Sequence, residues 1–344
     1  MASAWSPTPA YTTNGRYYGG SLAAAHYQDW ANTLARFAVD SAATGAPLYA
    51  ISIQNEPDWD ATPYPSCAYS SAQFHAFIPY LASALNSHGV GATKIIIGEQ
   101  AGWAIDRAAA TLADPVTKAM VGIVATHDYS GTIAAVDTGG KPLWMTEGCL
   151  KGAYDGGMTN ALSLADVVHR SLVTGGVSAW LYWNIIGTPW DNDNEGLTDP
   201  AARDTATPAN EMAKRAYALG NWSKFVRPGY VRIGGTSDDT NVLVSAFKSP
   251  TGKLVIVAVN RSGSSVSSTF TLAGVAGTTM VPWLTSATSN LTQQPSVDVR
   301  SGSFTYTLPA SSLVTFVQSG AVSAPLRARR RGPRKKTATI LAPA

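Results

Sequence analysis

The first 226 residues alternate between two hydrophobic periods. Apolar residues recur every three or four positions in some segments, for example at Tyr27, Trp30, Leu34 and Phe37. This spacing predicts amphipathic helices, which we expect at about 19–45, 70–89, 108–119 and 162–173, and from Thr207-Pro208 through Met212 to Leu219. Nearly continuous apolar runs lie between them and predict strands buried on both faces, at 49–59, 93–100, 122–129, 142–148 and 177–186. Strands that alternate with helices indicate an α/β fold with a parallel sheet, and a (β/α)8 barrel is its closed form.

After residue 226 the pattern changes to short strands separated by Ser, Gly, Thr and Asp turns. The strands are expected at 241–248, 253–260, 266–273, 279–285, 303–309 and 312–318. Such a series is typical of an antiparallel β-sandwich. The sequence therefore predicts a barrel domain at 1–226, a sandwich side domain at 227–319 and a disordered basic tail at 320–344.

Composition adds few constraints on function. With 45% hydrophobic and 14% charged residues, 344 residues suffice for two cored domains. The formal charge is +3, but the segment RARRRGPRKK at 327–336 carries the excess, and acidic residues outnumber basic ones elsewhere. No nucleic-acid partner is therefore expected. No apolar run reaches about 18 residues, so no membrane span is expected, and the N-terminus lacks the apolar run of a signal peptide.

Candidate chemistry gathers at the predicted strand ends. In a parallel barrel, active groups lie at the carboxyl ends of the strands. The residues there are Asn55, Glu56, Glu99, Gln100, His127, Tyr129, Glu147, Trp183 and Asn184. Glu56 and Glu147 lie three strands apart and are expected to face each other across the barrel mouth. A retaining glycosidase needs such a pair about 5 to 5.5 Å apart, one carboxyl group protonated through a raised pKa and the other ionised to attack.

Other interpretations of these residues remain open at this level. Either glutamate could be a solvated acid at a strand end, and His127 could belong to the core. Trp5, Trp59 and Trp183 are candidate platforms for the apolar face of a sugar ring, but tryptophan is also a common core residue. Glu99 is expected to be a hydrogen-bonding partner at the rim. The segment DNDNEG at 191–196 resembles the start of a calcium loop but lacks the closing glutamate, so we predict no required metal. No cofactor is expected either.

Several motifs together carry a family resemblance. SIQNEPDW, THDY, LWMTEG and NWSKFVRPGYVRI resemble glycoside hydrolase family 30 over about residues 4–318. The resemblance implies a retaining (β/α)8 enzyme with a side β-sandwich, in which Glu56 is the acid/base and Glu147 the nucleophile. It also implies that Asn55 contacts the sugar next to the cleaved bond and that Tyr129, in the H-x-Y motif begun by His127, steadies the nucleophile. The polysaccharide substrate, and secretion, are implied in the same way.

The chain departs from the family pattern at two places. Glucuronoxylan-specific members carry an arginine pair after strand eight, where this chain has YWNIIGTPWDNDNEG, so dependence on glucuronate branches is expected to be weak or absent. The segment SAWSP resembles the end of strand three, so the barrel is expected to lack its first strands. An open sheet exposes unpaired edges, and we expect such a fragment to be unstable or to associate.

These observations lead to one main functional hypothesis. The chain is predicted to be a retaining, endo-acting endo-β-1,4-xylanase that does not depend on glucuronic acid branches. Within the same enzyme class, a β-1,6-glucanase or galactanase and a glucosylceramidase-like β-glucosidase remain as alternatives. In a different class, an inactive fragment that only binds polysaccharide remains possible. The sequence does not specify an oligomeric state.

Overall fold

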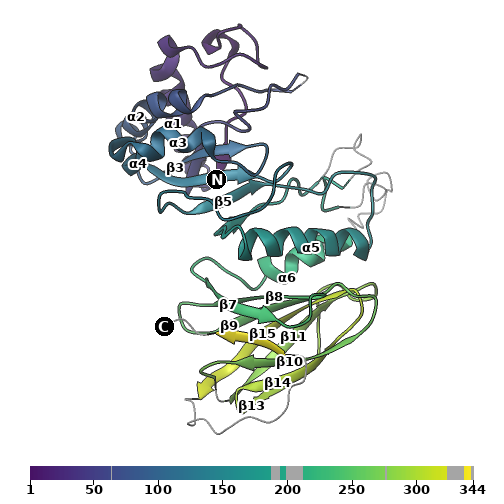
Figure 1. The fold of residues 1–344 in the computed structure, drawn as a ribbon. Helices are drawn as coiled ribbons and strands as arrows, with labels where there is room; N and C mark the ends of the chain where they lie inside the picture. The colour runs from purple at the N-terminus through teal and green to yellow at the C-terminus, as the bar shows by residue number, and fades with distance from the viewer. Residues whose placement is uncertain (63, 187–193, 199–211, 276, 324–336, 342–344) are drawn as a thin grey trace. The chain divides into compact units, whose positions relative to one another are not determined.

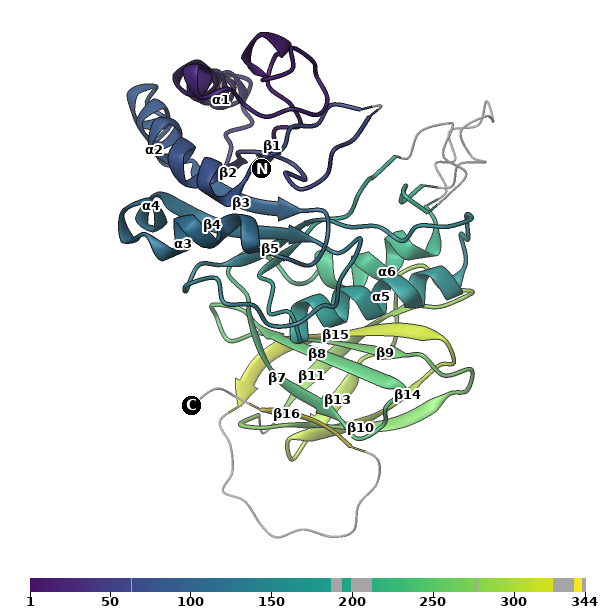
Figure 2. The ribbon, with the colours of Figure 1, turned by 45° about the horizontal axis from the view of Figure 1, so that its top comes forward.

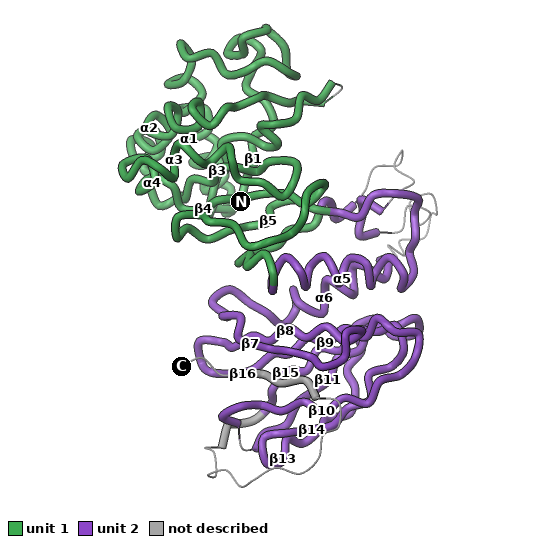
Figure 3. The backbone as a smooth tube through the Cα atoms, viewed as in Figure 1, with its two compact units in different colours: residues 1–148, 174–182 green, residues 149–173, 183–344 purple. Residues whose placement is uncertain are grey.

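The computed structural model describes residues 1–344 except 63, 187–193, 199–211, 276, 324–336 and 342–344. The chain divides into two compact units (Figure 3). The first comprises residues 1–148 and 174–182, and the second comprises residues 149–173 and 183–344. Each unit is described separately below. Among the described residues, none of the helices combines the length and apolar character needed to cross a lipid bilayer.

The first unit is built on a parallel sheet of six strands in the order β1-β2-β3-β4-β5-β6. The strands are β1 (Ala2–Ser3), β2 (Ala50–Ser52), β3 (Lys94–Gln100), β4 (Val121–His127), β5 (Leu143–Glu147) and β6 (Ala179–Trp180). Sequential neighbours in a parallel sheet are the arrangement of a (β/α) barrel wall, as the hydrophobic pattern predicts. Side chains of Ala50, Ile96, Ile123 and Ala125 form a buried cluster on this sheet.

The helices of the first unit lie on one side of this sheet (Figures 1 and 2). They are α1 (Tyr27–Ala43), α2 (Ser71–Ser87), α3 (Ala109–Ala113) and α4 (Pro115–Met120), with the 3-10 turns η1 (Pro9–Tyr11), η2 (Ala24–His26) and η3 (Asp106–Ala108). Helix α2 begins with a complete capping box, in which Ser70 and Gln73 satisfy each other's backbone N–H groups. The order strand, helix, strand therefore follows the predicted α/β pattern.

Several elements of the first unit differ in detail from the sequence prediction, among them the strand expected at 49–59, of which β2 comprises only Ala50–Ser52. The helix expected at 108–119 is broken into α3 and α4, because Asp114 precedes Pro115 and adopts an extended conformation (φ −96°, ψ 116°). Phe37 was expected on the buried face of α1 but is 53% exposed, because Ala38 occupies that face instead. The strand expected at 177–186 pairs only over the two residues of β6.

The described residues of the second unit form a largely antiparallel sheet of ten strands and two helices. The strands are β7 (Val231–Ser237), β8 (Val242–Lys248), β9 (Leu254–Asn260), β10 (Val266–Leu272), β11 (Gly277–Thr285), β12 (Thr292–Gln293), β13 (Val297–Arg300), β14 (Ser303–Leu308), β15 (Ser312–Ser323) and β16 (Thr337–Leu341). Their order is β12-β11-β13-β14-β10-β16-β7-β8-β9-β15, and an additional pairing of β11 with β15 closes the sheet around a hydrophobic core. Helices α5 (Met158–Val173) and α6 (Lys214–Ser223) pack against each other.

The six strands predicted after residue 240 all occur, as β8, β9, β10, β11, β14 and β15. Strand β16 was not expected: residues 337–341 lie in the predicted disordered tail but pair in parallel with β10 and antiparallel with β7. The boundaries predicted at 226/227 and 319/320 stay predictions. The expected helix start at Thr207-Pro208 lies outside the described residues; α6 begins at Lys214, and Met212 forms an isolated bridge with Thr198 instead of a helical turn.

Candidate active site

Four ionisable side chains meet at the carboxyl ends of neighbouring strands in the first unit. Glu99 lies near the end of β3, while His127 and Glu147 are the last residues of β4 and β5 and are register partners. Glu56 follows β2 by four residues. All four are at most 9% exposed, so their charges interact with little screening by water. The open alternative of solvated strand-end acids is therefore excluded for Glu56 and Glu147.

The backbone bends sharply at two of these residues. Glu56 and Glu99 have φ angles of 44° and 51°, in the left-handed region that non-glycine residues rarely adopt. The register between β3 and β4 shifts between Gly98 and Gln100, which places Glu99 on a bulge that redirects its side chain. Gly98 permits this bulge, because a Cβ atom there would lie 2.3 Å from the carbonyl oxygen of Ala125. Strain of this kind concentrates at functional sites.

The two carboxyl groups expected to act together are close in space. One carboxylate oxygen of Glu56, one of Glu147 and a ring nitrogen of His127 all lie within 4.8 Å of one another. Nδ1 of His127 is 3.3 Å from Oε1 of Glu56. The Tyr129 hydroxyl donates a hydrogen bond of 2.9 Å to Oε1 of Glu147. Carboxyl groups whose oxygens approach this closely are typical of retaining rather than inverting glycosidases.

A third carboxylate lies behind this pair. Ser3 Oγ donates a hydrogen bond of 2.6 Å to Oε2 of Glu99. Oε1 of Glu99 is 4.0 Å from Nε2 of His127, an ion-pair distance longer than a hydrogen bond. The backbone N–H of Glu56 also donates to the carbonyl oxygen of Glu99 at 2.9 Å. His127 therefore lies between two carboxylates, one at each ring nitrogen.

The local charges shift the pKa values of three groups. Burial disfavours the charge on His127, but the carboxylates of Glu56 and Glu99 outweigh it and raise the pKa to about 9. Burial would raise the pKa of Glu99, but its contacts with His127 and Ser3 lower it below the ordinary value. Burial raises the pKa of Glu147 to about 7, against the opposing effects of His127 and Tyr129. The raised carboxyl pKa expected of the acid is found on Glu147, which the family resemblance makes the nucleophile, so this pKa does not support the expected assignment of the two roles.

The same cluster contains the donor types of a metal site. Glu56, His127 and Glu147 are the group in the described part of the chain whose ligand atoms approach closely enough to hold an ion. A metal ligand must be deprotonated, whereas His127 lies between two carboxylates that favour its protonated form. We therefore do not assign these residues as metal ligands, and the cluster is better described as an ion-pair network.

Two of the predicted substrate-binding residues adjoin the network through the backbone. Asn55, only 4% exposed, precedes Glu56, and its backbone N–H donates to the carbonyl oxygen of Ala4 at 2.7 Å. Trp59 is 55% exposed, and its backbone N–H donates to the carbonyl oxygen of Glu56 at 3.0 Å. Trp59 is therefore a surface residue on the loop that carries Glu56, and the core interpretation of this tryptophan is excluded.

The other two tryptophans differ in their placement. Trp5 is partly buried and packs edge-on against Tyr64, with ring centroids 5.6 Å apart. Gln54 Nε2 fixes the Trp5 loop by a hydrogen bond of 2.8 Å to the Trp5 carbonyl oxygen. Trp183 is partly buried and belongs to the second unit. In the DNDNEG segment, residues 191–193 lie outside the described residues.

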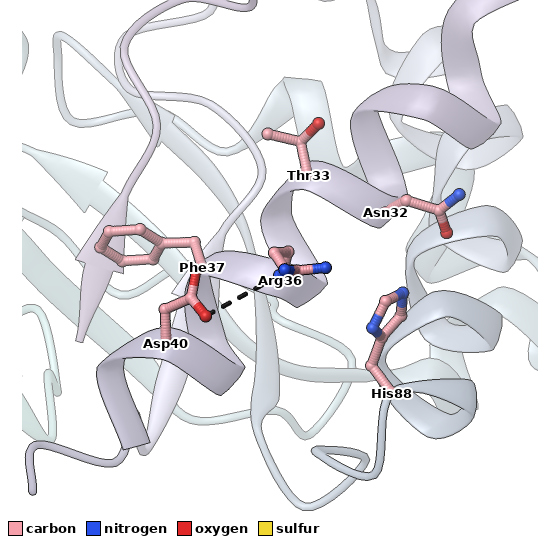
Figure 4. Close-up of a pocket in the computed structure, with 6 residues that line it drawn as sticks. All are labelled: Asn32, Thr33, Arg36, Phe37, Asp40 and His88. Carbon is pink, nitrogen blue, oxygen red and sulfur yellow. Dashed lines mark ion pairs between the residues drawn. The ribbon is translucent and has the colours of Figure 1, made fainter. Parts of the chain in front are cut away.

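A surface pocket on helix α1 contains none of the predicted site residues. Figure 4 shows its lining by Asn32, Thr33, Arg36, Phe37 and Asp40 of α1 together with His88. Arg36 and Asp40 form an ion pair of 3.8 Å one helical turn apart, with both side chains about 70% exposed (72% and 67%). Such exposed pairs contribute little to stability. The pocket offers no convergent buried polar groups and is not a candidate active site.

The sequence prediction did not include two polar side chains near the cluster: Ser3, which binds Glu99, and Gln54, which binds the backbone beside Glu56. Ser3 lies in β1, a strand too short to have a hydrophobic period. Gln54, fully buried, immediately precedes the NEP motif, and it binds the carbonyl oxygens of Trp5 and Asn55. Both residues lie close in sequence to predicted site residues, Ser3 to Trp5 and Gln54 to Asn55, and this proximity could have identified them.

Comparisons with known proteins indicate that the chain is a glycoside hydrolase. The model of the glycosyl hydrolase family 30 β-sandwich domain matches residues 229–316, and the model of glycosyl hydrolase family 59 matches residues 24–197. A glucuronoxylanase of Bacillus subtilis (strain 168) is 30% identical over 336 residues, with 92% of this chain and 73% of that protein covered. The lysosomal acid glucosylceramidase of Mus musculus is 27% identical, with 77% of this chain and 57% of that protein covered.

Solved structures of glycoside hydrolases are similar to this chain as well. The glycoside hydrolase family 30 subfamily 8 xylanase from Clostridium acetobutylicum has a TM-score of 0.82 and 33% identity, with 92% of this chain and 79% of that chain covered. The catalytic domain of a family 30 xylanase from Talaromyces cellulolyticus has a TM-score of 0.80 and 26% identity, with 92% and 75% covered. The predicted fold, a (β/α) barrel wall with a β-sandwich, is therefore confirmed.

Proposed function

The chain belongs to glycoside hydrolase family 30, and we propose that it is a retaining endo-β-1,4-xylanase that uses Glu147 as nucleophile and Glu56 as acid/base. The observation that carries the proposal is the buried pair itself. A carboxylate oxygen of Glu56 lies within 4.8 Å of one of Glu147, which supports a double displacement, since that mechanism needs two closely spaced carboxyl groups. The xylanases among the relatives support the choice of substrate.

In the first step, Glu147 attacks the anomeric carbon while Glu56 transfers a proton to the departing glycosidic oxygen. The C–O bond of the substrate breaks, and a bond from the anomeric carbon to a Glu147 oxygen forms. Tyr129 holds one oxygen of Glu147 by its 2.9 Å hydrogen bond, which fixes the orientation of the carboxylate. The other oxygen is left to attack.

In the second step, Glu56 acts as a base. It takes a proton from a water molecule, which attacks the anomeric carbon and releases Glu147. Two inversions give net retention of the anomeric configuration. Asn55, directly before Glu56, supplies an amide for a sugar hydroxyl, and Trp59, on the loop after Glu56, supplies an exposed aromatic face for a pyranose ring.

We further propose that cleavage does not depend on glucuronic acid branches. The loop at 182–196 contains no arginine or lysine, so it offers no cation to bind a uronate there. Because xylan lies in the plant cell wall, outside the cells of any organism that degrades it, we also propose that the protein acts as a secreted enzyme.

The test is hydrolysis by the purified chain of linear β-1,4-xylan, glucuronoxylan, β-1,6-glucan and β-1,6-galactan, followed by reducing-end release. We expect comparable rates on both xylans and oligosaccharides of mixed length as early products, with no release by Glu147→Ala. Release from a β-1,6-linked polymer alone, or from small aryl β-glucosides alone, would refute the xylanase proposal. Binding to xylan without release would favour the inactive, polysaccharide-binding alternative.

A further inference from the structure

His127 is fully buried, and charged groups surround it. Glu56 faces Nδ1 from the loop after β2, Glu99 faces Nε2 from β3, and Glu147 is the neighbour on β5. The ring of Tyr129 packs edge-on against the imidazole, with centroids 6.0 Å apart. Three carboxyl groups surround one imidazole, and the pKa of Glu99 among them is lowered, so the arrangement favours the protonated form of His127.

Glu99 is the carboxylate of this group that the proposed reaction leaves without a role. It is 1% exposed, and Ser3 holds it from behind with a 2.6 Å hydrogen bond to Oε2. Its other oxygen points to the edge of His127 opposite to Glu56. A buried carboxylate 4.0 Å from Nε2 stabilises a charged imidazole.

The backbone ties the same residues together. Glu56 N–H donates to the Glu99 carbonyl oxygen at 2.9 Å, and both residues have left-handed φ angles of 44° and 51°. Glu99 is therefore connected to Glu56 twice, once by the main chain and once through His127. A purely structural acid would need neither the bulge nor the alignment with the imidazole.

We propose that Glu99 is a positioning residue for the proposed glycosidase reaction: it holds His127 as an imidazolium whose Nδ1–H is directed at Oε1 of Glu56. The consequence lies in the first step, in which Glu56 changes from a neutral acid to a carboxylate. An imidazolium 3.3 Å away stabilises the charge that develops there, so it contributes more in the transition state than in the ground state. No net proton leaves His127 in this step.

The inference rests on the proposed function, but its first test does not require a substrate. The chain has five histidines, and the ring signals of His127 in a nitrogen-15 NMR titration can be identified by their loss in His127→Gln. We expect His127 in the wild type to titrate near pH 9. In Glu99→Gln, which removes the charge but keeps the shape, we expect the midpoint to fall by about one pH unit or more. Asp40→Asn, an exposed loss of the same charge on α1, is the matched control and should leave His127 unchanged.

The second test is kinetic. Glu99→Gln should lower kcat on xylan by about tenfold or more with little change in KM, and should move the alkaline limb of the pH profile to lower pH. Glu99→Asp, which keeps the charge, should restore the position of that limb and part of kcat. A loss of kcat with an unchanged pH profile, or an unchanged His127 titration in a folded Glu99→Gln protein, would overturn the inference. A wild type that cleaves no xylan while His127 shifts as expected would overturn the proposed function instead.

Discussion

The hydroxyl group of Tyr129 donates a hydrogen bond of 2.9 Å to Oε1 of Glu147, and both side chains lie at the ends of adjacent parallel strands. This bond acts on the ionised form of the carboxyl group and so opposes the increase in pKa that burial causes. Because an attacking carboxylate must be ionised, the contact makes Glu147 a better nucleophile near neutral pH.

Removal of that hydroxyl should therefore change both rate and pH dependence. With the Glu147 pKa near 7 in the wild type, we expect the acidic limb of kcat/KM to have its midpoint near pH 7. In Tyr129→Phe the pKa of Glu147 rises further, so the limb should move to higher pH, and kcat at pH 7 should fall by roughly 10- to 100-fold. Tyr80→Phe on the surface of α2 is the control. An identical acidic limb in wild type and Tyr129→Phe would contradict this account.

The two glutamates should respond differently to azide. Glu147→Ala should reduce turnover by roughly 10⁴-fold or more, and azide should rescue it by direct attack to give a glycosyl azide of inverted configuration. Glu56→Ala leaves the covalent intermediate able to form from an activated aryl xyloside, and azide should then give the retained configuration. NMR of the azide products measures both. If the configurations were exchanged between the variants, the roles of Glu56 and Glu147 would be exchanged too.

The charge on His127 should make the free energy of unfolding depend on pH. Its pKa of about 9 in the folded state lies above about 6.5 in the unfolded chain. The stabilisation is therefore complete below pH 6.5 and is lost as pH rises through 9, by roughly 3 kcal/mol. Urea unfolding from pH 6 to 10 should show this decrease in the wild type and in the exposed control His88→Gln. A decrease of the same size in His127→Gln would assign it to other groups.

Trp59 offers a test of substrate binding. Its side chain is 55% exposed on the loop that follows Glu56. Stacking on a sugar ring is worth about 1 kcal/mol, so Trp59→Ala should raise KM for xylan oligosaccharides by about fivefold and change kcat little. Phe37→Ala removes a ring of similar exposure from α1 and should leave KM unchanged. Equal effects of both substitutions would count against Trp59 as a sugar platform.

The sequence predicted the parts of the fold that follow from periodicity. Strands β3, β4 and β5 are continuous apolar runs, and because parallel strands end on one edge, the sequence predicts that Glu56, His127 and Glu147 lie together. The β-sandwich strands follow from their alternation in the same way. The sequence Asp114-Pro115 favours a break between α3 and α4, but the apolar pattern on either side predicts one continuous helix.

The remaining features depend on contacts that have no local signal. The bulge at Glu99 and the left-handed backbone of Glu56 arise from the packing of β3 against its neighbours, and neither residue type favours that conformation. Ser3 reaches Glu99 across 96 residues of sequence, and β16 pairs with β10 across about 70 residues. Such pairings are set by tertiary structure rather than by the sequence of either segment.

The most direct test of the central claim is covalent trapping of the nucleophile. A 2-deoxy-2-fluoro xyloside with a good leaving group forms the glycosyl-enzyme faster than water can release it, and mass spectrometry of the digested protein locates the bond. The account predicts one label per chain, on the peptide that contains Glu147, and no label in Glu147→Ala. A label on Glu56, or an unlabelled protein that still hydrolyses xylan, would contradict it.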